Sequence, residues 1–152
     1  MAVADRLASL GLELPSVAAP AGAYVPAVVA GDLVFTAGQL PFVDGALART
    51  GLLGADVTVE EAADLAALCA LNALAAVGSV LDGLDRIIQV VKVTGFVASA
   101  PGFTDQPKVL NGASQLLVDL FGDRGRHARS AVGVAALPLG SPVEVELVVR
   151  FR

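Results

Sequence analysis

Two charged residues near the end of the chain, Arg129 and Glu144, are the best placed to act on a small anionic molecule. Arg129 opens a predicted strand over 129–137, and a guanidinium can grip a carboxylate through two parallel hydrogen bonds. Glu144 lies in a predicted strand over 143–151, and a carboxylate in a partly dry cleft can orient or deprotonate a water molecule. Each residue also has a structural interpretation. Arg129 could form a salt bridge or a solvated strand end, and Glu144 could belong with Glu146 to an outward polar stripe.

The spacing of these two residues does not bring them together within one pair of strands. We expect the strands of Arg129 and Glu144 to form an antiparallel hairpin around a turn over 138–142. Pairing outward from that turn places Arg129 opposite Phe151, at the end of the hairpin far from Glu144. Within such a hairpin, the two side chains would meet only across a boundary between subunits.

Four other residues have side chains suited to binding or catalysis. Tyr24, the only tyrosine, follows a glycine-containing turn at the start of a predicted strand over 24–30. Its hydroxyl could meet a ligand, or it could be a structural residue with only its hydroxyl in water. His127, the only histidine, lies in a basic loop and is expected to be solvated. Asn72 is expected to be a hydrogen-bonded helix residue, and Cys69, the only cysteine, a core residue.

The composition excludes several classes of protein. The chain has 152 residues, with 10 Lys and Arg against 15 Asp and Glu, so its net charge is −5. This balance argues against a nucleic-acid-binding surface, which needs clustered basic residues. A hydrophobic content of 55% excludes a disordered chain, and one cysteine excludes an internal disulfide. Charged residues make up only 16%, against roughly 25% in typical domains, which predicts that another subunit covers part of the surface.

An uncharged segment, Leu65 to Leu81, reaches only the short end of the length needed to cross a bilayer. It is rich in alanine, has acidic flanks and lacks a Lys or Arg anchor, which predicts a buried helix and no membrane partner. The first twelve residues carry Asp5 and Arg6 and lack the pattern of a secretory signal. We therefore expect a cytoplasmic protein.

The hydrophobic patterning predicts one α+β domain over residues 1–152. Two main helices can cover only one face of its sheet. In the last strand, the odd-numbered residues should pack on the helices and the even-numbered ones should form a mixed, interface-like face. The expected elements are a short helix over 3–10, strands over 24–30 and 33–37 around Gly31-Asp32, a helix over 58–80 with a Thr58/Glu61 capping box, a strand over 86–97, a helix from about 104 to 121, and the strands 129–137 and 143–151.

Three stretches together resemble the reactive-intermediate deaminase (Rid, or YjgF-like) family, whose members were once widely described as L-PSP endoribonucleases. The resemblance covers about residues 20–152 and leaves 1–19 as an N-terminal extension, as in a longer subgroup. The stretches are Gly22-Ala23-Tyr24-Val25 with Leu33 to Pro41, the helix of Asn72 with the strand Val91 to Val97, and Ala128-Arg129-Ser130-Ala131-Val132 followed by Leu137-Pro138 and Val143-Glu144-Val145-Glu146.

This resemblance implies a chorismate-mutase-like fold and a homotrimer with clefts between its subunits. In the family's active members, residues matching Arg129, Glu144 and Tyr24 respectively bind the substrate carboxylate, position a water and line the pocket. Ala131 stands where the family often has a cysteine, so the pocket is altered there. The implied reaction is hydrolysis of an enamine or imine, such as 2-aminoacrylate, to a 2-keto acid and ammonia, with no metal or organic cofactor.

Two other functions stay open. One is a non-catalytic module that binds a small carboxylate such as a 2-keto acid. The other is an endoribonuclease, against which the net charge of −5 argues because no basic stripe exists to follow a nucleic-acid backbone. Half of the basic residues do fall within the last 29 positions, so a local basic patch is compatible with the sequence.

Overall fold

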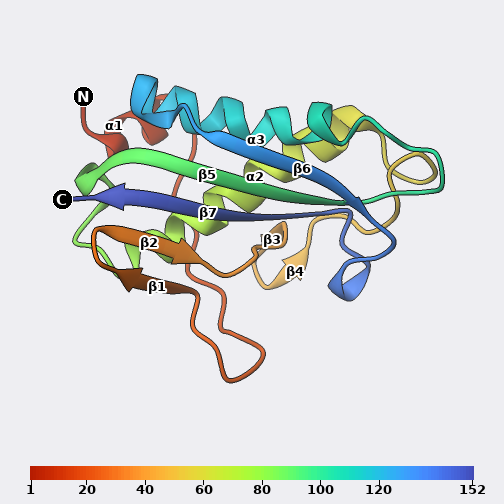
Figure 1. The fold of residues 1–152 in the computed structure, drawn as a ribbon, viewed down its shortest axis with the longest axis horizontal. Coiled ribbons are helices and arrows are strands. Elements are labelled where there is room, and N and C mark those ends of the chain that lie inside the picture. The colour runs from red at the N-terminus through yellow and green to blue at the C-terminus, as the bar shows by residue number, and fades with distance from the viewer.

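Five strands form a mixed sheet in the order β1-β2-β7-β5-β6, and the helices lie against one of its faces (Figure 1). The computed structural model describes residues 1–152. A separate two-stranded sheet pairs β3 with β4. The elements are α1 (Val3–Ser9), β1 (Ala27–Ala30), β2 (Leu33–Thr36), β3 (Phe42–Val43), β4 (Ala46–Leu47), α2 (Val59–Gly78), β5 (Ile87–Ala98), α3 (Gln106–Phe121), β6 (Ala128–Val134) and β7 (Val143–Phe151), with short 3-10 turns at Leu84–Arg86, Gly122–Gly125 and Pro138–Gly140.

The α+β fold expected from the sequence is confirmed, with α2 and α3 on one face of the sheet. The hairpin of β1 and β2 turns at Gly31-Asp32, where Gly31 adopts a φ of 63°. A second hairpin, β3 with β4, lies between the predicted strand over 33–37 and the predicted helix over 58–80, where no element was expected. It turns at Asp44-Gly45, whose φ angles of 49° and 82° fit a tight turn of the kind that Asp-Gly favours.

Helix α2 is the central helix of the fold. Thr58 and Glu61 form the predicted capping box, in which each side chain accepts a hydrogen bond from the other residue's backbone N–H. By length and composition α2 is apolar enough to cross a membrane, but 12 of its residues are buried inside the fold, as predicted. Helix α3 approaches α2 closely at Gly112 of α3. A Cβ at this position would lie 1.9 Å from the Ala63 carbonyl oxygen of α2, so only glycine fits there.

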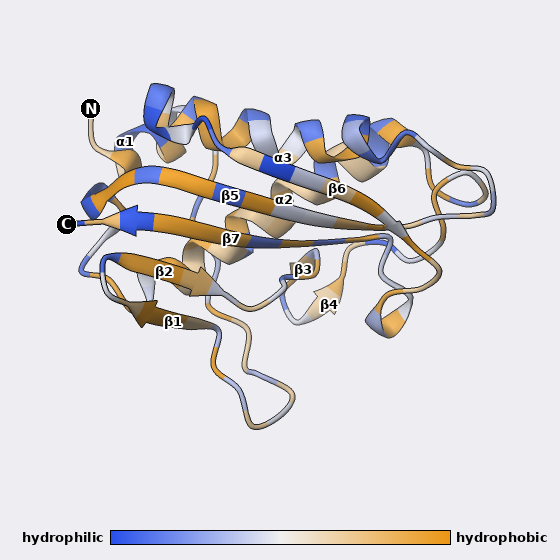
Figure 2. Cartoon of the chain, in the orientation of Figure 1, coloured by the Kyte–Doolittle hydropathy of each residue, from blue (hydrophilic) through white to orange (hydrophobic).

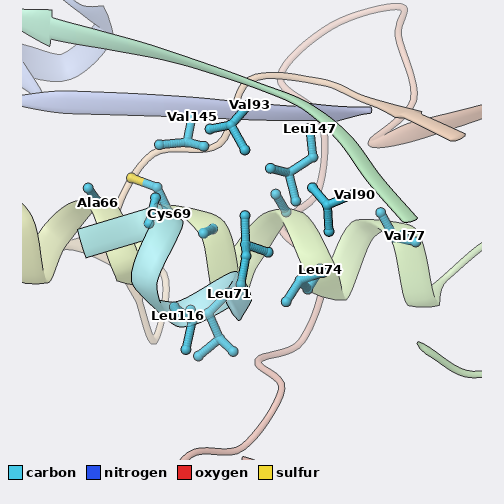
Figure 3. Packing of buried hydrophobic residues seen from close by; sticks show 14 of the residues in the cluster. Ala66, Cys69, Leu71, Leu74, Val77, Val90, Val93, Leu116, Val145 and Leu147 are labelled. Carbon is cyan, nitrogen blue, oxygen red and sulfur yellow. The ribbon is translucent and has the colours of Figure 1, made fainter. Parts of the chain in front are cut away.

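The two faces of β7 differ as the alternation of its residues predicts. The odd-numbered residues, from Val143 to Val149, are fully buried against the helices, while Glu144, Glu146 and Val148 on the other face are half-buried. Figure 3 shows Val145 and Leu147 of β7, with Val90 and Val93 of β5, on the side of α2 from which Cys69 projects. Along α3, hydrophobic and hydrophilic segments alternate, as expected of a helix with one face in the core (Figure 2).

Strand β6 pairs with β5 and not with β7, so the predicted hairpin between the last two strands is wrong. The β5-α3-β6 segment is a crossover unit in which β6 runs parallel to β5, with Arg129 beside Val93. Strand β7 pairs antiparallel with the other edge of β5, with Glu144 beside Phe96. The connection between β6 and β7 crosses the end of β5, where Ala98 N–H donates to the Pro142 carbonyl at 2.9 Å.

Candidate functional site

The side chain of Arg129 reaches from β6 to α3 and is held there by one nitrogen. Nη1 donates to Asn111 Oδ1 at 2.9 Å and to Ser114 Oγ at 3.1 Å, which uses both of its hydrogens. The N–H groups on Nε and Nη2 have no hydrogen-bond partner within the chain. Nε and Nη2 form the edge of a guanidinium that can bind a carboxylate through two parallel hydrogen bonds. Arg129 is therefore anchored with its carboxylate-binding edge unpaired.

A structural salt bridge does not account for Arg129. No carboxylate lies within 4.0 Å of its guanidinium, whereas Arg150 pairs with Asp32 and Arg126 pairs with Asp123. Neutral partners hold Arg129 instead, so its positive charge stays uncompensated within one chain. This arrangement favours the binding of an anion from outside the chain at Arg129.

Glu144 lies on the open face of the sheet, at the wall of a cleft of about 320 Å³. Its carboxylate rests against the backbone of Gly38, where a Cβ would come within 1.9 Å of Oε1. Burial, and then the charge of Glu146, raise the pKa of Glu144. No donor within the chain binds the carboxylate, so it is available to a water molecule in the cleft. The cleft is lined by residues of three segments, 18–26, 38–42 and 138–144, and includes Tyr24, Gln39, Leu40 and Leu139.

The segment Gly38 to Pro41 forms part of this cleft because two sets of hydrogen bonds hold it against the core. Gln39 and Val145 of β7 exchange backbone hydrogen bonds of 2.8 and 3.0 Å. The Asn72 side-chain amide on α2 donates to the carbonyls of Leu40 at 2.9 Å and Phe42 at 3.2 Å. The expectation that Asn72 is a hydrogen-bonded helix residue is therefore confirmed.

Tyr24 lies in the same cleft as Glu144 but outside the strand that was predicted to contain it. Strand β1 begins only at Ala27, after Pro26, which lacks the N–H that a sheet ladder requires. The side chain of Tyr24 is exposed, and its hydroxyl accepts a hydrogen bond from the Ala21 N–H at 3.3 Å. Tyr24 is thus placed to contact a ligand that enters the Glu144 cleft.

Within one chain, Arg129 and Glu144 lie on opposite faces of the sheet. Arg129 shares a face with its neighbour Val93, which is fully buried toward the helices. Glu144 shares the open face with its neighbour Phe96. Ala131, opposite Gly95, packs against the hydrophobic core on the Arg129 side. A single copy therefore does not bring Arg129 and Ala131 together with Glu144 and Tyr24.

Sequence reasoning missed Asn111 and Ser114, the two partners of Arg129 on α3, and treated His127 only as a solvated loop residue. The ring of His127 is half-buried, with Nε2 at 2.9 Å from Ser114 Oγ and Nδ1 at 2.6 Å from the Gly125 carbonyl oxygen. The expectation of a solvated His127 is therefore wrong, because α3 and the preceding 3-10 turn enclose it. Asn111 and Ser114 stand three residues apart on one face of α3. Only the pairing of β6 with β5 sets that face beside Arg129.

Cys69 is fully buried in the core, as expected, with its S–H directed at the Val143 carbonyl oxygen at 3.8 Å. Burial raises the pKa of this thiol well above its ordinary value, so Cys69 is not a nucleophile in the folded chain. No group of three or more His, Cys, Asp or Glu side chains is arranged to hold a metal ion.

Comparison with known proteins agrees with this architecture. The family model described as "YjgF/chorismate_mutase-like, putative endoribonuclease" matches residues 4–151. The chain belongs to this YjgF-like family. It is 48% identical over 151 residues to protein TCP17 of Trypanosoma cruzi, covering 99% of this chain and 94% of that protein. The sequence motifs around Tyr24, Asn72 and Arg129 thus indicated the correct family.

Two similar solved structures show how much of the chain is shared. Protein Atu1372 of Agrobacterium tumefaciens, whose function is unknown, is 45% identical and superposes with a TM-score of 0.93, covering 99% of this chain and 94% of that one. TdcF of E. coli, solved with bound serine, is 25% identical with a TM-score of 0.61, covering 90% of this chain and 94% of that one. The first relative thus shares nearly the whole chain, and the second shares less of it.

Proposed function

We propose that this YjgF-like protein hydrolyses small enamines and imines to 2-keto acids and ammonia, in clefts between the subunits of a homotrimer. The observation that carries the proposal is the unpaired carboxylate-binding edge of Arg129. The relative TdcF binds serine, a small molecule with a carboxylate of the kind that this edge fits. The half-buried carboxylate of Glu144 supplies the second group that the reaction needs.

The positions of these groups support clefts shared between subunits, as in the proposed trimer. Since Arg129 and Glu144 are on opposite faces of the sheet, a ligand that contacts both must lie between two copies. The open face of the sheet also exposes large apolar residues, including Val28, Phe35 and Val132, which a neighbouring subunit would cover. Each cleft would then combine Arg129 and Ala131 of one copy with Glu144 and Tyr24 of the next.

The proposed reaction assigns each group a step. Nε and Nη2 of Arg129 hold the carboxylate of the imine tautomer of 2-aminoacrylate. Glu144 takes a proton from a water, whose oxygen attacks the imine carbon. Glu144 passes this proton to the nitrogen, which gives a carbinolamine. It then transfers the proton of the new hydroxyl group to the same nitrogen, so the C–N bond breaks as the C=O bond forms, and pyruvate and ammonia leave. The raised pKa of Glu144 suits this role, because a stronger base removes the proton from water more readily.

The test is the rate at which the protein forms pyruvate and ammonia from 2-aminoacrylate generated in the cuvette by a serine dehydratase. We expect wild type to accelerate this step over the spontaneous reaction. Arg129→Ala should weaken pyruvate binding at least about tenfold, since a charge-assisted contact is worth roughly 1.5–3 kcal/mol. Arg129→Lys should recover part of this, because Lys keeps the charge without the planar two-donor edge. Glu144→Gln should keep binding while turnover falls.

The controls are Arg126→Ala and Glu60→Gln, which change exposed side chains of the same types outside the cleft. Both should behave as wild type. Pyruvate binding through Arg129 without any turnover would refute deamination and identify a non-catalytic carboxylate-binding protein. RNA cleavage that Glu144→Gln abolishes would favour the endoribonuclease instead.

A further inference from the structure

A continuous run of hydrogen bonds connects Arg129 with the only histidine of the chain. Nη1 of Arg129 donates to Ser114 Oγ at 3.1 Å, and Ser114 Oγ lies 2.9 Å from His127 Nε2. His127 Nδ1 lies 2.6 Å from the carbonyl oxygen of Gly125. The run joins β6, α3 and the 3-10 turn Gly122–Gly125. Neither Ser114 nor His127 takes part in the deamination steps proposed above.

The donors and acceptors set the direction of this run. A carbonyl oxygen only accepts, so Nδ1 of His127 carries the hydrogen in the bond to Gly125. In the neutral ring Nε2 is then the acceptor, and the Ser114 hydroxyl donates to it. The same hydroxyl oxygen accepts from Arg129. Every group in the run is satisfied when His127 is neutral, and burial favours that form because it lowers the pKa of His127.

We propose that Ser114 and His127 are positioning residues that orient the Arg129 guanidinium and link its ligand occupancy to the protonation of His127. The inference rests on the proposed function, because the ligand concerned is the anion held by Arg129. The hydrogen bonds to Asn111 and Ser114 restrain only Nη1. They therefore fix the plane of the guanidinium while Nε and Nη2 remain open to a carboxylate.

The linkage follows from the groups that surround the ring of His127. Strand β6 contributes the charge of Arg129, α3 contributes the neutral Ser114 hydroxyl, and the turn contributes the Gly125 carbonyl. When His127 is protonated, Ser114 Oγ can accept from both Nε2 and Nη1, since a hydroxyl oxygen has two lone pairs. The hydrogen bond from Arg129 to Ser114 is then kept. The positive charge of the protonated His127 lies close to that of Arg129, with only the Ser114 hydroxyl between them.

The sign of the effect follows from these charges. An anion bound at Arg129 offsets the guanidinium charge and so raises the pKa of His127. By reciprocity, protonation of His127 strengthens anion binding, so affinity rises as the pH falls through the pKa of His127. No carboxylate of the chain forms a salt bridge with His127.

The test uses His127 as its own reporter, because a single histidine gives unambiguous imidazole signals in NMR. ¹⁵N-labelled protein is titrated with and without saturating pyruvate, in wild type, Ser114→Ala, Ser114→Thr and Arg129→Ala. At neutral pH, wild type should show the Nδ1–H tautomer, and pyruvate should raise the pKa of His127. Arg129→Ala should raise that pKa without pyruvate and remove the response to pyruvate.

Calorimetry on the same proteins measures the positioning effect. Ser114→Ala should weaken pyruvate binding about threefold to tenfold, the loss expected for one hydrogen bond, and should loosen the tautomer preference of His127. Ser114→Thr keeps the hydroxyl and should restore both. Ser9→Ala removes a hydroxyl that bonds only to the Arg6 carbonyl on α1, and it should behave as wild type.

A pKa of His127 that does not move when pyruvate saturates Arg129 would overturn the linkage. Wild-type affinity in folded Ser114→Ala would overturn the positioning role. Failure of the proposed function looks different: the pyruvate effects on His127 would be present, but 2-aminoacrylate would not be hydrolysed. If pyruvate bound wild type and Arg129→Ala equally, both the anchor in the proposed function and this inference would be refuted.

Discussion

The carboxylate of Glu144 lies directly against the backbone of Gly38, in the space that a side chain at position 38 would occupy. A Cβ there would come within 1.9 Å of Oε1 and 2.8 Å of Cδ of Glu144. The atoms in the way belong to the end of a flexible side chain and not to the backbone. Gly38→Ala should therefore fold with near-wild-type stability while it displaces Glu144. We expect turnover to fall at least tenfold with pyruvate affinity retained, measured by steady-state kinetics and calorimetry.

The control for Gly38→Ala is Gly45→Ala, at the tip of the β3-β4 turn, where a Cβ would meet nothing within 4 Å. Gly45 has a φ of 82°, so its replacement should strain the turn and lower stability slightly without changing turnover. Wild-type turnover in Gly38→Ala would show that Glu144 does not act from its observed position.

Gly112→Ala should lower the stability of the fold, whereas Gly38→Ala should lower turnover and leave stability nearly unchanged. A Cβ at position 112 would lie 1.9 Å from the backbone carbonyl oxygen of Ala63, where α3 crosses α2. Backbone atoms cannot move aside as a side chain can, so the helices must separate. We expect a loss of about 1–3 kcal/mol in the free energy of unfolding, measured in urea. Stability equal to wild type would mean that the two helices do not pack as closely as described.

Glu144→Gln should change stability in a pH-dependent way. The folded protein raises the pKa of Glu144, so it holds the proton more tightly than the unfolded chain does. The associated stability is fully present below the unfolded pKa and is lost as the pH rises through the folded pKa. Gln mimics the neutral form. The variant should be more stable than wild type at pH 7, and the gain should vanish in acid. Thermal unfolding across pH measures this, with Glu60→Gln as the control.

Cys69→Ala should retain activity and lose stability by about 1 kcal/mol from missing packing. Cys69 is buried among the side chains of the core on the helix side of the sheet, whereas Glu144 lies on the open face. In wild type, a thiol reagent such as Ellman's reagent should react with Cys69 only after unfolding, because burial raises its pKa. Loss of activity in a well-folded Cys69→Ala protein would contradict this account.

A subunit-mixing experiment tests the shared cleft. Arg129→Ala and Glu144→Gln are each expected to be inactive alone. If each cleft takes Arg129 from one subunit and Glu144 from the next, equal mixing by refolding should restore about a quarter of the wild-type activity, because half of the subunits supply each intact group. Light scattering should give a trimer mass. A monomer at micromolar concentration, or no recovery in mixed trimers, would reject the shared cleft.

The local parts of the fold could be predicted because each depends on neighbours in sequence. The capping box of Thr58 and Glu61 and the alternating burial of β7 follow from spacing alone. The partner of β6 could not be predicted in this way. A strand that follows a helix can pair in parallel with the strand before that helix, or antiparallel with the strand after it, and short-range patterns do not distinguish the two.

In the candidate site too, some residues could be proposed from local sequence features, and others depend on tertiary contacts. Arg129, Glu144 and Tyr24 could be proposed from the sequence because their residue types and motifs are local features. Asn111, Ser114 and the burial of His127 depend on α3 lying over β6, which is a tertiary contact. Their roles therefore became visible only with the pairing of β6 and β5.

The position of β7 also bears on how the protein is made. This strand follows every other strand of the sheet along the chain, yet it lies between β2 and β5 and is the only connection between the β1-β2 hairpin and the rest of the sheet. Until β7 has been synthesised and has emerged, the edges of β2 and β5 that it will join stay open in the nascent chain. The last strand made therefore completes the sheet, and the exposed strand edges make the interval before it the period when a chaperone has most to protect.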